Sequence, residues 1–221
     1  MIKKEEELFD EWKKKRPGFV SDGIVQLDNY LESEFKILYL LKEVNGGKNW
    51  DLRDLLKKGE RKPTWDNIAL WTFGINNLNK NYLWAELKEL RSKEFRIEQL
   101  LKIAAINLKK ESGSHTANNK IIWGYAKEDQ LFLKKQIELY DPKIIVCCGT
   151  PTGDILKKFN LVEEFDKWKL SFWGVRYHVS EQNIIIISYC HPEARIDDNF
   201  KYFPLINTIR EITKSLKYSL D

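Results

Sequence analysis

Four short, mostly apolar runs limit what this chain can fold into more than any other feature. They are FKILYLL (35–41), IAAINL (103–108), KIIVCC (143–148) and NIIIISYC (183–190). Each has the length of a strand, and each is apolar at successive positions, as expected for strands buried on both faces. Helix-like segments separate them, a pattern typical of parallel sheets covered by helices on both sides. The sequence therefore predicts an α/β fold, a three-layer α/β/α sandwich around a mostly parallel four-stranded sheet.

The segments between these runs predict helices and contain no linker long enough to divide the chain. A single domain is expected over residues 1–221, beginning with an amphipathic helix at 3–16. Residues 160–182 admit two interpretations, a β-hairpin with WGVRYHV (173–179) as one arm or an irregular excursion. Further helices are expected at about 50–58, in pieces across an insertion at about 61–101, at 120–140, after 149–151 and at 199–217.

Composition narrows the class of protein. Hydrophobic residues make up 43% of the chain, which argues against general disorder. The formal net charge of +4 permits contact with nucleic acid without requiring it. No apolar run approaches the roughly 20 residues that a membrane-spanning helix needs, and the start MIKKEEELFDEW lacks the apolar core of a signal peptide. We expect a cytoplasmic, monomeric protein with no membrane partner.

The three cysteines do not indicate a metal centre. Cys147, Cys148 and Cys190 all lie in the strand-like runs. Adjacent residues of a strand face opposite ways, so Cys147 and Cys148 are not expected to form a disulfide. The chain shows no metal-ligand spacing either. Buried free thiols, no metal and no cofactor are the prediction.

Polar residues follow the ends of the four apolar runs. Glu43 and Asn45-Gly46-Gly47 come after the first run, Asn107 is near the end of the second, Gly149-Thr150 follows the third, and His191 follows the last. In open parallel sheets the ligand site lies outside the carboxyl ends of the strands. An acid, an amide, glycines and a histidine are therefore predicted to converge on one edge of the sheet.

These strand ends, in this order, resemble the uracil-DNA glycosylase superfamily. Members of that superfamily carry G-E-x-P-G after the first strand, an Asn at the end of a middle strand, and H-P-S-x after the last. The counterparts here are KEVNG (42–46), INLKK (106–110) and HPEAR (191–195). The likeness runs from about residue 35 onward, and residues 106–150 are especially similar to the iron–sulfur-type microbial branch. The cysteines that hold the cluster in that branch are missing here.

The resemblance implies hydrolysis of the N-glycosidic bond of uracil, or of another deaminated or damaged base, extruded from DNA. His191 would donate a hydrogen bond to the departing base, and Glu43 would orient the water. Asn107 would read the base edge, because an amide offers a donor beside an acceptor. The remaining candidates are a backbone contact from Asn45, Gly46 and Gly47, an aromatic stacking partner in Trp65 or Trp50, and Arg195 entering the space that the base leaves.

Departures from the motifs keep other functions open. Lys42 and Asn45 replace the glycine and the proline of the first motif, and Glu193 replaces a serine that contacts phosphate. A carboxylate at that place repels DNA, and Asp197 and Asp198 add to the effect. One alternative is a catalytically altered member that binds nucleic acid or a nucleotide without excision. Another is a phosphate-binding domain in which 45–47 cradles a nucleotide.

Overall fold

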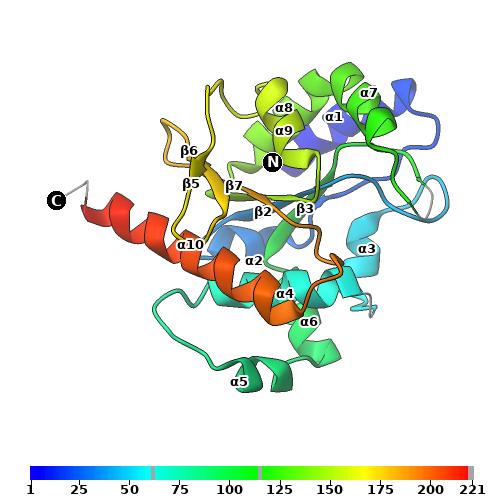
Figure 1. The fold of residues 1–221 in the computed structure, drawn as a ribbon. Coiled ribbons are helices and arrows are strands. Elements are labelled where there is room, and N and C mark those ends of the chain that lie inside the picture. Colours follow the sequence, from blue (N-terminus) through cyan, green and yellow to red (C-terminus); the bar gives the residue numbers. More distant parts are fainter. Residues whose placement is uncertain (61–62, 114–115, 219–221) are drawn as a thin grey trace.

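A mixed seven-stranded sheet forms the centre of the molecule (Figure 1). The computed structural model describes all residues except 61–62, 114–115 and 219–221. The strands follow one another across the sheet in the order β1-β3-β2-β4-β7-β6-β5. Their bounds are β1 (Gly23–Ile24), β2 (Ile37–Leu41), β3 (Ile103–Asn107), β4 (Ile144–Cys148), β5 (Lys169–Leu170), β6 (Arg176–Val179) and β7 (Ile185–Tyr189).

The prediction of an α/β fold is confirmed, but the prediction of a four-stranded sheet is wrong. The four apolar runs form the four adjacent parallel strands β3, β2, β4 and β7. Three further strands extend the sheet, all antiparallel: β1 on β3, β6 on β7 and β5 on β6. β1 and β5 have two residues each, too few to leave a pattern in the sequence. The open question about residues 160–182 is resolved in favour of a hairpin, formed by β5 and β6.

Helices cover both faces of the sheet (Figure 1). One layer contains α3 (Leu52–Lys57), α4 (Pro63–Ile75), α5 (Trp84–Glu89), α6 (Lys93–Leu100) and α10 (Asp198–Tyr218). The other contains α1 (Ile2–Lys15), α2 (Leu27–Glu32), α7 (Asn119–Glu128), α8 (Gln130–Tyr140) and α9 (Thr152–Lys158). None of the described helices is long and apolar enough to span a bilayer.

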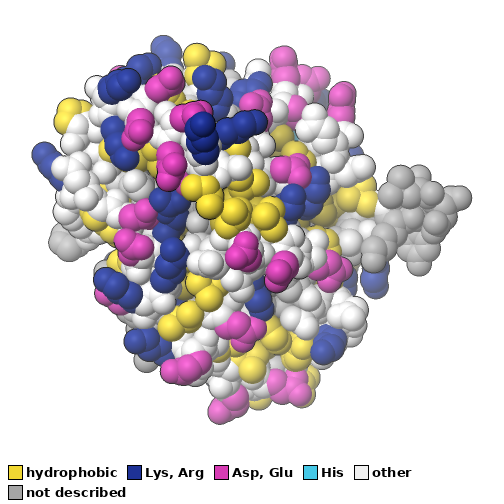
Figure 2. Space-filling model, turned by 180° about the vertical axis from the view of Figure 1, so that it is seen from behind, with side chains coloured by type: hydrophobic (Ala, Val, Ile, Leu, Met, Phe, Trp, Pro, Cys, Tyr) yellow, Lys and Arg dark blue, Asp and Glu magenta, His cyan; other side chains and the backbone are white. Residues whose placement is uncertain are grey.

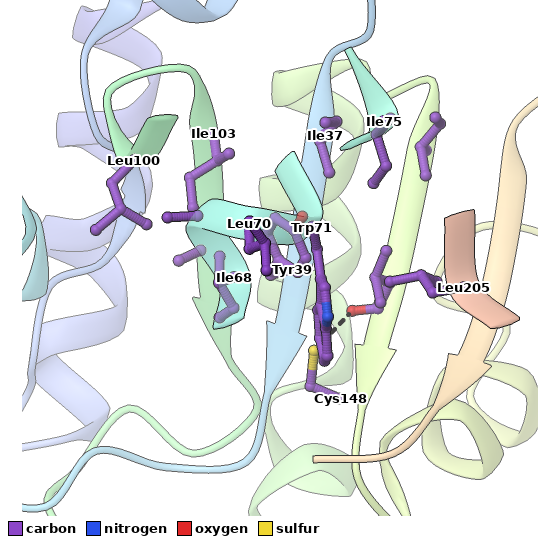
Figure 3. Packing of buried hydrophobic residues seen from close by; sticks show 14 of the residues in the cluster. Ile37, Tyr39, Ile68, Leu70, Trp71, Ile75, Leu100, Ile103, Cys148 and Leu205 are labelled. Carbon is purple, nitrogen blue, oxygen red and sulfur yellow. Dashed lines mark hydrogen bonds between the residues drawn. The ribbon is translucent and has the colours of Figure 1, made fainter. Parts of the chain in front are cut away.

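Alternate strand residues supply two separate hydrophobic cores, because successive side chains of a strand point to opposite faces. In β2, Ile37, Tyr39 and Leu41 belong to the core beneath α4 and α10, whereas Leu38 and Leu40 belong to the core beneath α1 and α8. Figure 3 shows the first core, with Trp71 of α4 inserted between strand side chains and Leu205 of α10. This double-sided burial explains why the parallel strands are apolar at every position.

Most helix predictions are confirmed, with one break. The helix predicted at 120–140 divides at Asp129 into α7 and α8. The Asp129 carboxylate is fully buried and accepts hydrogen bonds from Arg16 at the end of α1, at 2.9 and 3.0 Å. The ion pair requires a polar residue inside a stretch that otherwise reads as one amphipathic helix. The short α2 was not predicted.

Candidate functional site

A cavity of about 550 Å³ lies at the carboxyl edge of the parallel strands. It is lined by the segment after β2, the last residue of β3, the loop after β7 and side chains of α3 and α4. This volume falls within the range of small-molecule sites. The lining residues are Leu41, Lys42, Glu43, Val44, Asn45, Trp50, Leu52, Leu55, Thr64, Trp65, Asn107, Thr116, Ala117, His191 and Glu193.

The cavity brings together most of the site residues predicted from the sequence. Six of them line it, and three do not. Those that line it are Glu43, Asn45, Trp50, Trp65, Asn107 and His191. Gly46, Gly47 and Arg195 lie outside the lining. Residues separated by as many as 148 positions, from Glu43 to His191, therefore share one hollow through the parallel strand order.

Asn107 is held in one orientation by a buried carboxylate. The Asp22 carboxylate oxygen Oδ2 accepts hydrogen bonds from the Asn107 backbone amide at 2.8 Å and from its side-chain Nδ2 at 3.3 Å. A carboxylate only accepts, so the side-chain atom that faces Asp22 must be the NH2 group. The amide oxygen of Asn107 then remains for the cavity that the residue lines, together with the second N–H of the amide.

Behind Asn107, a buried polar network holds Asp22 itself. Lys110 donates to Asp22 Oδ1 at 2.5 Å and to Gln136 at 2.9 Å, and both members of the Asp22–Lys110 ion pair are fully buried. Burial lowers the pKa of Lys110, while Asp22 acts in the opposite direction. Gln136 donates to Asp22 at 3.1 Å and to Tyr140 at 3.0 Å. This network joins the floor of the cavity to α8.

His191 offers a donor to the cavity. Its Nδ1 accepts a hydrogen bond from the backbone amide of Glu193 at 3.1 Å, so in the neutral ring the proton lies on Nε2. Burial lowers the pKa of His191, and Lys42 and Lys201 lower it further, against the opposite effect of Glu193. The ring is therefore neutral at pH 7, and Nε2–H is its one hydrogen-bond donor.

The backbone that carries His191 is restrained from one side by Gly149. Gly149 has a φ of +82°, a region that favours glycine, and a Cβ there would lie 3.1 Å from the His191 Cβ. The Gly149 amide also donates to the Tyr189 carbonyl at 2.9 Å. Gly149, which follows β4, thus helps to fix the position of His191, which follows β7.

The loop after His191 is tied to α4 and α10. Asn67 of α4 and Lys201 of α10 each donate to the Pro192 carbonyl at 2.9 Å. The Glu193 carboxylate accepts hydrogen bonds from the backbone amide and the hydroxyl of Thr64 in the first turn of α4. Because the N-terminal end of a helix carries partial positive charge, Glu193 stabilises that end. Its charge is partly compensated before any phosphate approaches.

Asp198, one of the acids after His191, is also compensated. It forms ion pairs with Arg91 at 2.8 Å and with Lys201 at 2.8 Å, and it accepts from Asn67 at 3.1 Å. Burial acts to raise its pKa, but hydrogen bonds from Lys201, Arg91 and Asn67 lower the pKa below its usual value. Asp197 is exposed. The repulsion expected from this acidic loop is smaller than the sequence indicates.

Glu43 is engaged by a cation. Its carboxylate accepts from Lys109 Nζ at 2.7 Å, and the two side chains are 7% and 8% exposed. Lys109 also donates to the Ser112 carbonyl at 2.9 Å. Gly113 packs so closely on the Glu43 carboxylate that a Cβ at that position would overlap it. Glu43 is thus a firmly held side chain at the cavity wall.

The two tryptophans proposed as stacking partners differ in how deeply they are buried. Trp65 of α4 is 7% exposed and belongs to the hydrophobic core, although it also lines the cavity. Trp50 is half-buried, and its Nε1 donates to the Gly47 carbonyl at 2.9 Å. A Cβ on Gly46, whose φ is +145°, would lie 3.6 Å from the Trp50 indole. Gly46 and Gly47 therefore support Trp50 beside the cavity and do not line it themselves.

Two charged residues of the site were missed in the sequence, and one candidate is placed elsewhere. Asp22 lies in a loop region without a motif, and only its pairing with buried Lys110 reveals its role. Lys42 lines the cavity, and burial lowers its pKa while Glu43 acts to raise it. Its position directly after an apolar run was a usable signal. Arg195 is exposed and outside the lining.

Comparison with known proteins assigns no family. No family model and no curated protein sequence matches the chain. Within the described part of the chain, no three His, Cys, Asp or Glu side chains gather closely enough to hold a metal ion. The side chains that line the cavity offer amides, carboxylates, a lysine and a neutral imidazole.

Proposed function

We propose that the protein is a DNA glycosylase of the uracil type, which hydrolyses the N-glycosidic bond of a deaminated base extruded from DNA. One observation carries the proposal. The Asp22-fixed amide of Asn107 and the neutral imidazole of His191 line one cavity of about 550 Å³. The order of the strand-end motifs, which resembles the uracil-DNA glycosylase superfamily, supports it.

His191 supplies the catalytic hydrogen bond in this proposal. When the glycosidic bond breaks, the base departs with negative charge on its carbonyl oxygens. A neutral Nε2–H donates to such an oxygen as the charge develops, and a preorganised donor of this kind contributes about 3–4 kcal/mol to transition-state stabilisation. The Glu193 amide, bound to Nδ1, keeps the proton on Nε2.

Asn107 selects the base. Its amide oxygen accepts from a ring N–H, and its remaining N–H donates to the adjacent carbonyl oxygen. Uracil and hypoxanthine both present an N–H beside a carbonyl oxygen. Cytosine presents an amino group beside an unprotonated ring nitrogen, which would require the opposite amide orientation. Asp22 accepts from Nδ2 at 3.3 Å and opposes that rotation.

A second candidate function is compatible with the contact between Glu43 and Lys109. Glu43, the group that would orient the water, already accepts from Lys109 at 2.7 Å. A carboxylate has further lone pairs, so the ion pair still permits a water to bind. The same contact equally suits a protein that holds a nucleotide or an unpaired base without excision. Excision and retention of the base are separable by experiment.

The test is base release from a uracil-containing single-stranded oligonucleotide, followed by alkaline cleavage. We expect the wild-type protein to produce alkali-labile sites, and His191→Ala and Asn107→Ala each to lower the rate by about 10²–10³-fold. His178→Gln is the matched control, because His178, on β6, is hydrogen-bonded to Glu163 and does not line the cavity.

Three outcomes would count against the proposal. If the wild-type protein releases no uracil or other deaminated base, but binds DNA in a salt-dependent way, the non-excising candidate replaces the glycosylase. If His191→Ala keeps the wild-type rate, the role assigned to His191 is wrong. A nucleotide that co-purifies with the protein would instead favour nucleotide binding in the cavity.

A further inference from the structure

The turn between β5 and β6 exposes large apolar side chains to solvent. Leu170 is 68% exposed, Phe172 89% and Trp173 45%. The two rings pack edge to face, with centroids 5.9 Å apart. Contiguous exposed aromatic residues of this kind commonly mark an interaction surface.

This turn is held rigidly. Ser171 is buried and shares a 2.8 Å hydrogen bond with Thr208 of α10, and its hydroxyl accepts from the Val175 amide at 3.2 Å. The Ser171 amide donates to the Val175 carbonyl at 3.0 Å, and Gly174 closes the turn with a φ of +71°. The aromatic residues are therefore presented by a fixed backbone.

Positive charge alternates with the aromatic residues. Lys167, Lys169 and Arg176 flank the turn and are exposed. Asp166 is the one acid in residues 166–176, and the exposed Glu164 comes shortly before it. Arg176 lies 5.8 Å from the Trp168 ring and 3.4 Å from Asp154 on α9, an exposed ion pair that contributes little. By contrast, Lys and Arg are interspersed with Asp and Glu on the face shown in Figure 2.

The strand register places the turn at the same edge of the sheet as the candidate site. Arg176 pairs with Ser188, and β6 runs antiparallel to β7. Residues 171–175 therefore extend beyond Ser188 in the direction in which β7 continues to His191. The turn also lies against α10, in the layer whose α4 supplies Trp65 to the cavity.

We propose that the turn Leu170–Gly174 and its flanking cations form a second contact for unpaired DNA, on which bases stack several nucleotides from the one in the cavity. Aromatic faces stack on bases of any sequence, and interleaved cations neutralise phosphates. A second copy of the chain is a poorer occupant, because β5 offers only two residues to strand pairing. The inference rests on the DNA-binding part of the proposed function and does not require excision.

The test is binding of full-length protein to fluorescent, undamaged oligo(dT), measured by anisotropy. We expect the double variant Phe172→Ala/Trp173→Ala to raise Kd about tenfold or more. Lys169→Ala should lower the salt dependence of Kd. The matched control is Leu83→Ala, which removes a side chain of 71% exposure from the start of α5. An oligonucleotide too short to reach from the cavity to the turn should bind both proteins equally.

Several results would overturn the inference. One is an unchanged Kd for the double variant while its melting temperature equals that of the wild type. A second is loss of binding to anionic phospholipid vesicles with no effect on oligo(dT), which would assign the turn to a membrane surface. A third is conversion of a dimer to a monomer in sedimentation. Absence of uracil excision with intact oligo(dT) binding would contradict the glycosylase alone.

Discussion

Asp22 and Asn107 are joined by two hydrogen bonds through a single carboxylate oxygen, one to the backbone amide and one to the side-chain amide. Asp22 lies in a loop 85 residues before Asn107, and its other oxygen binds Lys110 in an ion pair with no exposed surface. The orientation of Asn107, the residue proposed to read the base, is therefore fixed by an ion pair whose members do not line the cavity.

Removing the Asp22 charge alone should destabilise the protein strongly. Asp22→Asn leaves the buried Lys110 without its ion-pair partner, and loss of one partner of such a pair costs about 3–5 kcal/mol. Adding Lys110→Met should recover much of the loss, because an apolar side chain replaces the charge that has no partner. The measurement is the free energy of unfolding in urea for both variants. Glu98→Gln, which breaks the exposed Lys102–Glu98 pair, is the control and should change it by less than about 0.5 kcal/mol.

A stability of Asp22→Asn within 1 kcal/mol of the wild type would contradict the role given to the ion pair; the threshold is roughly the upper value for an exposed pair. A double variant no more stable than Asp22→Asn would do the same. Both outcomes can be measured without knowing what the protein binds.

His191 predicts the pH dependence of the site. Burial lowers the pKa of His191 from its ordinary value of about 6.5. The neutral, donating form is thus maintained throughout the neutral range, and excision should decline only as pH falls through the depressed pKa of the folded protein. The unfolded chain takes up the proton at higher pH than the folded one, so the His191 contribution to stability is complete above about pH 6.5 and is lost as pH falls toward the folded value.

The check combines excision rates with melting temperatures between pH 5 and pH 8. The melting temperature of the wild type should fall on acidification, partly because His191 takes up a proton on unfolding. His191→Gln should abolish that part of the fall, and His178→Gln should leave it unchanged. An excision rate that rises on acidification would mean that the imidazolium is the active form, and the role given to the neutral Nε2–H would be wrong.

Much of the sheet was predictable because burial on both faces makes a strand apolar at every residue. Ile144–Cys148 and Ile185–Tyr189 could be read from that property alone. The edge strands could not, since two residues such as Lys169 and Leu170 carry no periodicity. The break at Asp129 depended on Arg16, which is 113 residues away along the chain.

The composition of the cavity was predictable for a related reason. Parallel strands deliver their carboxyl ends to one edge, so the residues that follow them share a site wherever the strand order allows it. Contacts made through side chains were not predictable. Nothing local to Glu43 indicates Lys109, and nothing local to Glu193 indicates Thr64, because these partners come from other elements.

Substitutions of Glu193 separate two effects of this residue, the effect of its charge on DNA affinity and its role as the cap of α4. Its carboxylate accepts from the Thr64 backbone amide at 3.2 Å and from the Thr64 hydroxyl. Glu193→Gln keeps an acceptor oxygen but removes the charge, so DNA affinity should rise about two- to fivefold, as expected for one like-charge contact near a phosphate. Its melting temperature should fall only slightly, because the hydrogen-bonding cap persists and only the attraction between the carboxylate charge and the helix N-terminus is lost, about 0.3–1 kcal/mol. The increase in affinity should shrink as salt is added.

Glu193→Ala should gain the same affinity and lose stability, because the first turn of α4 loses a side-chain acceptor. A lost N-terminal cap costs about 0.5–2 kcal/mol. Glu138→Gln on α8, an exposed acid in the opposite helix layer, removes an equal charge and controls for net charge. Anisotropy with oligo(dT) and thermal melting measure the two effects. If Glu193→Gln binds no more tightly than Glu138→Gln, Glu193 does not face the DNA, and the loop after β7 is not the edge at which the strand enters.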